Sequence, residues 1–264
     1  MEISQRILLR RKILNKLKKA LNNNKITFGT WIQIPHPSIV EIIAHNCCNK
    51  LDWICVDMEH GVIDIESMAN LIRTIEKFDI TPVVRVPKND YIWIHRVLDA
   101  GAKGIIIPMI KTEEEAINAV SESLYPPEGI RSFGYSRANI YGSNFEEYIK
   151  EFNNEISIIL QIEHIKAVEN LEFILEIPHI DATFVGPLDL AGSLGKINEK
   201  NKNLVNEKLN YYLSESNKIG IPTGYHIIKP SKLLIEDIKA QGYKMIAIGI
   251  DVVFLSQKCN EIFG

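Results

Sequence analysis

Three ionisable side chains follow a single apolar run in the sequence LDWICVDMEHG. Asp57, Glu59 and His60 fall within four positions, at the point where a buried strand is expected to end. Carboxylates beside a histidine can transfer protons, bind a hard cation, or only form a polar turn. The segment by itself does not choose among these roles, so the choice depends on which other side chains the fold places beside it.

Polar or aromatic side chains also end several other apolar runs. They are Trp31 and Gln33 in the first run, Arg85 in the third, Gln161 and Glu163 in the fifth, Asp189 after the sixth and His226 in the seventh. Chemistry on a parallel barrel belongs at the carboxyl ends of its strands. In such a barrel two carboxylates, an arginine and a histidine converge on one face.

Eight apolar runs are predicted to be β-strands: residues 26–34, 51–57, 81–86, 102–109, 156–163, 181–187, 221–227 and 244–250. Most are continuous rather than alternating, which is typical of strands buried on both faces. Amphipathic segments separate them, and several begin with a Ser, Thr, Asp or Asn cap. This α/β order predicts a (β/α)₈ TIM barrel formed by residues 1–264 as one domain. An open doubly wound sheet is the alternative, but its glycine-rich phosphate motifs are absent from the sequence.

The N-terminal segment 1–22 is basic and amphipathic, and it predicts an extra helix over Ile3–Leu21 that packs on the barrel. Charges interrupt its apolar positions, unlike those of a signal peptide, and no apolar run reaches the roughly 20 residues of a membrane span. A net charge of −3 favours neither nucleic acid nor an anionic membrane. Four cysteines without a C-x-x-C pair are expected to be free thiols of a cytoplasmic protein.

Glu163 and Asp189 would end neighbouring strands, where two unpaired carboxylates repel each other. A divalent cation resolves this repulsion, and oxygen ligands indicate Mg²⁺ or Mn²⁺ with water and substrate in the other positions. Either acid could instead cap the helix that follows it. Arg85 interrupts an apolar strand, so it needs an anionic partner from Asp57, Glu59 or a ligand.

Six motifs occur in the order DMEHG, PVVRVP, LDAGAKGIIIPMI, YPPEGIRSFGYSRA, LQIE and FVGPLDLAGSLG. Together they resemble the HpcH/HpaI aldolase family of metal-dependent class II pyruvate aldolases, over roughly residues 26–255. The resemblance is to 4-hydroxy-2-oxoheptanedioate aldolase and 2-keto-3-deoxy sugar-acid aldolases. It implies an aldehyde-lyase that reversibly cleaves a 4-hydroxy-2-oxo acid to pyruvate and an aldehyde, using Mg²⁺ or Mn²⁺, with Co²⁺ also possible. It further implies a homo-oligomer, a hexameric trimer of dimers, in which the C-terminal helix is exchanged between subunits.

The resemblance also implies roles for individual residues. Glu163 and Asp189 would hold the metal, and the backbone N–H groups of Leu188 and Asp189 would hold the substrate carboxylate. Arg85 would stabilise the enolate oxygen, while Trp31 and Gln161 would line the pocket.

Proton transfer is implied for His60, which would work with Asp99 and take the proton from the 4-hydroxyl group. Asp57 would orient His60. Met58 stands where well-known members of the family have a small residue, so it is expected to contact the aldehyde. Arg131 and Arg137 in the long loop over residues 125–148 would either recognise an anionic aldehyde or remain solvated charges.

Three alternatives stay open on the sequence. A Schiff-base class I aldolase needs a lysine in the barrel mouth, but Lys103 and Lys244 stand at strand starts and Lys229 opens a helix. A CoA-thioester lyase of the citrate lyase β-subunit type needs a basic groove. A scaffold that binds a partner through its basic N-terminal helix needs no catalytic site.

Overall fold

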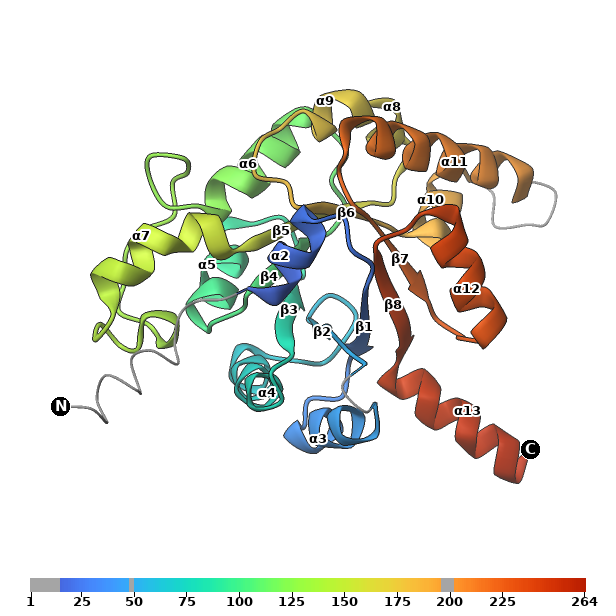
Figure 1. Cartoon of the computed structure of the whole chain (residues 1–264), viewed down its shortest axis with the longest axis horizontal. Coiled ribbons are helices and arrows are strands. Elements are labelled where there is room, and N and C mark those ends of the chain that lie inside the picture. Colours follow the sequence, from blue (N-terminus) through green and yellow to red (C-terminus); the bar gives the residue numbers. More distant parts are fainter. Residues whose placement is uncertain (1–14, 48–49, 196–201) are drawn as a thin grey trace.

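Eight parallel strands form a closed barrel in a computed structural model that describes residues 15–47, 50–195 and 202–264 (Figure 1). The strands are β1 Thr27–Ile32, β2 Trp53–Asp57, β3 Thr81–Arg85, β4 Gly104–Ile107, β5 Ser157–Ile162, β6 Ala182–Val185, β7 Thr223–Ile227 and β8 Met245–Ile250. Each strand pairs with the next, and β8 pairs with β1. The predicted barrel is confirmed, and the open doubly wound sheet is excluded.

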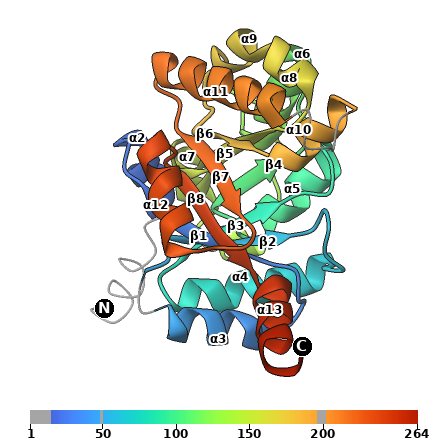
Figure 2. The same ribbon diagram turned by 90° about the vertical axis from the view of Figure 1, so that its right-hand side faces the viewer.

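Helices surround the barrel (Figures 1 and 2). They are α2 Lys16–Asn22, α3 Pro37–Asn46, α4 Ile65–Lys77, α5 Tyr91–Asp99, α6 Glu113–Ser123, α7 Phe145–Glu155, α8 Ile165–Glu169, α9 Leu171–Leu175, α10 Pro187–Ser193, α11 Lys202–Ile219, α12 Lys232–Gln241 and α13 Asp251–Phe263, with a 3₁₀ turn η1 at Arg137–Asn139. Side chains of Asp64, Asp90 and Thr112 accept backbone N–H bonds in the first turns of α4, α5 and α6. These caps satisfy donors that a helix leaves unpaired.

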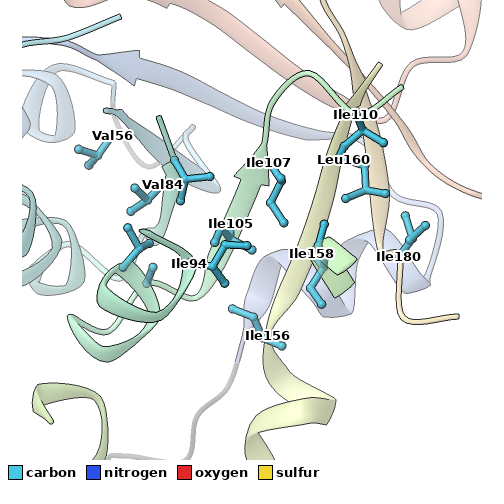
Figure 3. Close-up of a cluster of buried hydrophobic side chains, with 14 of the residues drawn as sticks. Val56, Val84, Ile94, Ile105, Ile107, Ile110, Ile156, Ile158, Leu160 and Ile180 are labelled. Atoms are coloured by element: carbon cyan, nitrogen blue, oxygen red, sulfur yellow. The ribbon is translucent and has the colours of Figure 1, made fainter. Parts of the chain in front are cut away.

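Two apolar cores lie on opposite sides of the strands. Figure 3 shows part of the outer core, in which Ile105 and Ile107 of β4 pack near Ile94 of α5. Ile106, between them in the chain, belongs to the inner core with Trp31, Trp53 and Phe184. Because side chains alternate along a strand, both faces of β4 are covered and its sequence is continuously apolar.

The barrel interior is filled because glycines on some strands make room for aromatic rings on a neighbouring strand. A Cβ atom added to Gly29 would lie 2.1 Å from the ring of Trp53, and one added to Gly224 would lie 2.2 Å from the ring of Phe184. The rings thus occupy the space that a side chain on the neighbouring strand would need. This close packing makes the barrel a rigid support for residues at its rim.

Helix α2 covers the end of the barrel at which the strands begin. Leu17 and Leu21 are 0% and 1% exposed and join the inner core. Asn15 donates from Nδ2 to the carbonyls of Lys103 and Glu155, at 2.6 and 2.7 Å. The predicted packing of this helix is confirmed from Lys16 to Asn22, while the part predicted over residues 3–14 lies outside the described residues.

Helix α13 leaves the end of β8 and extends away from the barrel (Figure 2). Leu255, Ile262 and Phe263 on it are 61%, 60% and 86% exposed. These apolar side chains suit an interface, but exchange of this helix between subunits stays a prediction. Within the described ranges, no helix is long and apolar enough to span a membrane.

Replacing Gly224 with Ala should destabilise the protein by about 1–3 kcal/mol, because the new methyl group collides with Phe184 inside a full barrel. Thermal unfolding should show a melting temperature lower by several degrees. Gly134→Ala is the matched control, since a Cβ there meets no atom within 4 Å. Equal melting temperatures for the two variants would contradict this account of the barrel interior.

Candidate active site

The two predicted metal ligands approach one point at the carboxyl end of the barrel. Glu163 follows β5, and Asp189 lies in the first turn of α10 after β6. A Cβ atom added to Gly186 would lie 2.9 Å from a carboxylate oxygen of Glu163 and 3.5 Å from one of Asp189. Both side chains also line a cavity of about 490 Å³. The predicted convergence of these carboxylates is therefore present in the fold.

Glu163 is buried, at 3% exposure, and its carboxylate accepts hydrogen bonds from the backbone N–H of Met109 at 2.8 Å and from Nε2 of Gln161 at 2.5 Å. Burial is the main cause that raises the pKa of Glu163 to about 7. The hydrogen bond from Met109 opposes this rise, and the negative charges of Glu59 and Asp189 add to it. A cation bound beside this carboxyl group would favour its ionised form and lower its pKa.

The donor set fits a hard divalent cation that is completed by small ligands. In the described part of the chain, no group of three or more His, Cys, Asp or Glu side chains is arranged to hold a metal ion. Two carboxylates that share an open cavity instead leave coordination positions for water and substrate, which Mg²⁺ and Mn²⁺ commonly accept. The observation that supports this fit is the buried Glu163 carboxyl group, whose pKa the nearby charge of the exposed Asp189 helps to raise.

Arg85 is the buried cation beside this pair, at 7% exposure. Its Nε and Nη2 atoms donate to Asp57 at 2.9 and 2.8 Å, and its Nη1 atom lies 2.9 Å from Glu59 and 3.5 Å from Gln161. Asp57 and Arg85 are register partners on β2 and β3, which explains their two-bond contact. Burial would raise the pKa of Asp57, but hydrogen bonds and charge from Arg85 outweigh burial and lower it. The expected anionic partner of Arg85 is thus supplied by both acids.

Trp31 and His226 form an aromatic layer next to Arg85. The Cζ atom of Arg85 lies 4.3 Å from the centre of the Trp31 ring system, within the range of a cation–π contact. The imidazole of His226 stacks on Trp31, with ring centres 5.1 Å apart and planes 9° from parallel. The sequence placed both residues at this end of the barrel, but it gave His226 no role.

His60 lies at the surface of the site, with a side chain that is 60% exposed. Its Nε2 atom is 3.8 Å from Glu59 Oε2. Asp57 meets His60 at the backbone, where Oδ1 accepts the N–H of His60 at 3.4 Å and that of Glu59 at 3.1 Å. Asp57 therefore fixes the backbone of DMEHG, while the carboxylate nearest the imidazole belongs to Glu59.

Asp99 lies at the other end of the barrel from His60 of its own chain. It ends α5, which leads into the start of β4, and it accepts a 2.6 Å hydrogen bond from Arg131. The buried guanidinium of Arg131 lies over Tyr125 at 4.5 Å and Phe152 at 4.4 Å, near the start of β5. Because Arg131 needs a counter-charge in this apolar setting, Asp99 has a structural partner far from the carboxylate pair.

The long loop carries its arginines away from the site. Arg137 pairs with Glu76 and donates to the carbonyl of Ala100 at 2.9 Å. Arg131 and Arg137 thus fasten the loop to the barrel, and neither is a solvated charge or part of the cavity beside Glu163.

Met58 differs from its predicted position. Its side chain is 5% exposed and belongs to the outer core, since Asp57 points into the barrel and the next residue must point out. The predicted contact with an aldehyde has no support at this position. The cavity instead exposes Met109 and Leu188, at 40% and 66%. Met109 was missed because an apolar residue at the end of an apolar run carries no chemical signal.

Comparison with known proteins identifies the family of the chain. Residues 27–257 match the family described as HpcH/HpaI aldolase/citrate lyase. The chain is 34% identical over 253 residues to a 5-keto-4-deoxy-D-glucarate aldolase of Citrobacter koseri, which covers 94% of this chain and 96% of that protein. It is 34% identical over 239 residues to a 4-hydroxy-2-oxovalerate aldolase of Novosphingobium aromaticivorans, which covers 90% and 89%.

A solved structure shares the fold over nearly the whole chain. The crystal structure of an HpcH/HpaI aldolase/citrate lyase family protein from Burkholderia cenocepacia has a TM-score of 0.87 and 30% identity, and covers 94% of this chain and 97% of that one. The chain therefore belongs to the HpcH/HpaI aldolase/citrate lyase family. Within it, the chain is a class II pyruvate aldolase, and the family is metal-dependent.

The raised pKa of Glu163 predicts a pH-dependent stability for the metal-free protein. A carboxyl group whose pKa is raised on folding contributes stability below its ordinary value of 4.5, and this contribution is lost as the pH rises through about 7. In thermal unfolding with chelator, Glu163→Gln should melt higher than wild type at pH 8, and the difference should shrink toward pH 5.

The exposed variant Glu114→Gln is the control and should follow the wild type at both pH values. An equal pH dependence for wild type and Glu163→Gln would show that Glu163 ionises normally in the fold.

Proposed function

We propose that this end of the barrel cleaves a 4-hydroxy-2-oxo acid into pyruvate and an aldehyde, with Glu163 and Asp189 as the metal ligands. The observation that supports this most directly is the shared approach of both carboxylates to one point beside a buried arginine. Mg²⁺ or Mn²⁺ is the proposed ion, and Co²⁺ is a further candidate. When bound, the cation supplies a Lewis acid for the negative charge that develops on the 2-oxo acid.

The residues around the pair bind and orient the donor half of the substrate. Leu188 and Asp189 stand in the first turn of α10, where backbone N–H groups have no carbonyl partner within the helix and can hold the substrate carboxylate. Arg85 stabilises the enolate oxygen by charge and hydrogen bonding. Gln161 contacts Arg85 through Oε1 and Glu163 through Nε2, so it couples their positions. Trp31 closes the floor of the site.

Proton transfer from the 4-hydroxyl group is assigned to His60, which is exposed enough to meet an incoming substrate. Asp57 acts through the backbone of the same loop. Asp99 lies at the opposite end of its own barrel, so its pairing with His60 requires Asp99 of the partner subunit. This requirement fits the proposed hexamer, a trimer of dimers in which exposed α13 is exchanged.

The geometry disfavours the two rival chemistries. Lys103 and Lys244 precede β4 and β8, at the end covered by α2, and Lys229 is exposed beyond β7. A Schiff-base lysine needs a desolvated position in the barrel mouth. A CoA-thioester lyase needs cations for the CoA phosphates, and no described residue lining the cavity beside Glu163 is a lysine or arginine.

The metal-dependent mechanism is tested by exchange of the pyruvate methyl protons in D₂O, followed by NMR with Mg²⁺. Wild type should exchange these protons, and EDTA should abolish the exchange. Glu163→Ala and Asp189→Ala should lose metal binding in calorimetric titrations. Arg85→Ala should keep the metal and lose at least tenfold in rate, because the charge on the enolate oxygen goes unstabilised.

Glu114→Ala, an exposed acid on α6, is the matched control and should behave as wild type. Exchange that survives complete chelation would refute the metal mechanism.

The cavity lining favours an aldehyde with a short apolar chain. Met109, Leu188 and Gly192 contribute apolar surface beside the carboxylate pair. In an aldol assay with pyruvate, acetaldehyde and propanal should therefore give higher kcat/KM values than glyoxylate or succinic semialdehyde. Met109→Lys should improve the two anionic aldehydes, and Met109→Leu should change neither preference. A wild-type preference for the anionic aldehydes would contradict this assignment.

A further inference from the structure

His226 has no part in the proposed chemistry, yet it is built into the layer under Arg85. On the basis of the proposed function, we infer that His226 is a positioning residue that holds Trp31 flat and, through Trp31, fixes the guanidinium of Arg85 for enolate stabilisation. The contacts run from Gly249 on β8 to His226 on β7, then to Trp31 on β1 and to Arg85 on β3. The last two contacts link strands that are not neighbours in the barrel.

His226 is anchored on the inner side of the barrel. Its Nε2 atom lies 3.0 Å from the carbonyl oxygen of Gly249 on β8. Gly249 has φ +66°, a backbone conformation that favours glycine, and a Cβ added there would lie 2.1 Å from the ring of Phe254. A carbonyl oxygen can only accept a hydrogen bond, so Nε2 carries the imidazole proton.

The ring of His226 is neutral at the pH at which an aldolase works. Burial lowers the pKa of His226 to about 4. The hydrogen bond to Gly249 and the charge of Asp57 oppose this shift, and the positive charge of Arg85 adds to it. A neutral imidazole can stack on an indole without repelling the guanidinium on that same indole. An imidazolium in this position would oppose Arg85.

Trp31 depends on its ring contacts for its orientation. Its indole N–H is buried and has no hydrogen-bond partner among the described residues. Phe184 touches Trp31 edge-on, with ring centres 5.9 Å apart, and His226 is stacked on it nearly in parallel. With no hydrogen bond to set its plane, the indole is held by packing against neighbouring groups. Loss of the parallel imidazole would let the indole ring tilt into the vacated space.

Arg85 receives two kinds of restraint. Asp57 holds one edge of the guanidinium by two hydrogen bonds, which still allow the group to rock about that edge. The face of Trp31 opposes this rocking, and the atom that would move most is Nη1, which contacts Glu59 and Gln161. Gln161 in turn bonds Glu163, so Nη1 is the part of Arg85 that points toward the substrate side of the site.

The inference is tested with three substitutions of His226. His226→Phe keeps a flat ring, His226→Leu fills the space without one, and His226→Ala leaves it empty. We expect Leu and Ala to slow pyruvate proton exchange about tenfold, the size of a lost cation–π contact, and Phe to stay within about threefold of wild type. Metal affinity should be unchanged in all three. Equal rates for the Phe and Leu variants would overturn the inference.

A double-mutant cycle separates positioning from general support of the fold. Arg85→Lys keeps the charge but removes the planar group that lies on Trp31. If His226 acts through Arg85, adding His226→Leu to Arg85→Lys should cost less than about twofold, whereas independent effects would multiply to the full tenfold. Melting temperatures identify any variant that is unfolded. If the double variant is unfolded, the exchange rates of His226→Phe and His226→Leu decide the question. A wild-type protein without exchange activity would refute the proposed function instead, which is a distinguishable result.

Discussion

The buried charge of Arg85 is the constraint around which the site is arranged. A guanidinium at this depth is tolerated only with anionic and hydrogen-bonding partners, and Asp57, Glu59 and Gln161 supply them. These partners come from β2, the loop after β2, and β5. The barrel must therefore bring the ends of β2, β3 and β5 together before Arg85 can be buried. The same requirement explains why so much charge follows β2 in DMEHG.

Among the described residues, acids outnumber cations at this end of the barrel. Asp57 and Glu59 compensate Arg85, and no described lysine or arginine forms an ion pair with Glu163 or Asp189. Repulsion and burial together push the proton affinity of Glu163 upward. Such a site is suited to a divalent cation, because the ion would offset the repulsion between the carboxylates and the cost of burying an ionised Glu163.

The fold was predictable because strands that are buried on both faces have continuously apolar sequences. Ile105, Ile106 and Ile107 are all buried, two in the outer core and one in the inner, and most of the eight strands are similarly continuous runs with helices between them. The convergence of Glu163, Asp189 and Arg85 followed from the same reasoning, since parallel strands end on one face.

The remaining features of the site depend on strand parity, on topology and on packing between distant segments. Met58 could have been placed correctly by strand parity, because Asp57 points inward. Asp99 could have been placed by topology, because the last turn of a barrel helix returns to the start of the next strand. Its pairing with Arg131, 32 positions along the chain, depends on how the long loop folds, and no local pattern encodes that. The stack of His226 on Trp31 is a packing result of the same kind.

In the proposed mechanism, the two chemical tasks fall at different depths of the site. Stabilising an oxyanion demands fixed groups in a place of low dielectric constant, and Arg85, Glu163 and Gln161 are all below 8% exposure. Proton transfer to and from the departing half of the substrate demands a group that solvent can reach, and the side chain of His60 is 60% exposed. Burial lowers the pKa of His226. His60 at the surface is the histidine that an incoming substrate can reach, and His226 inside the barrel is suited to hold a ring in place.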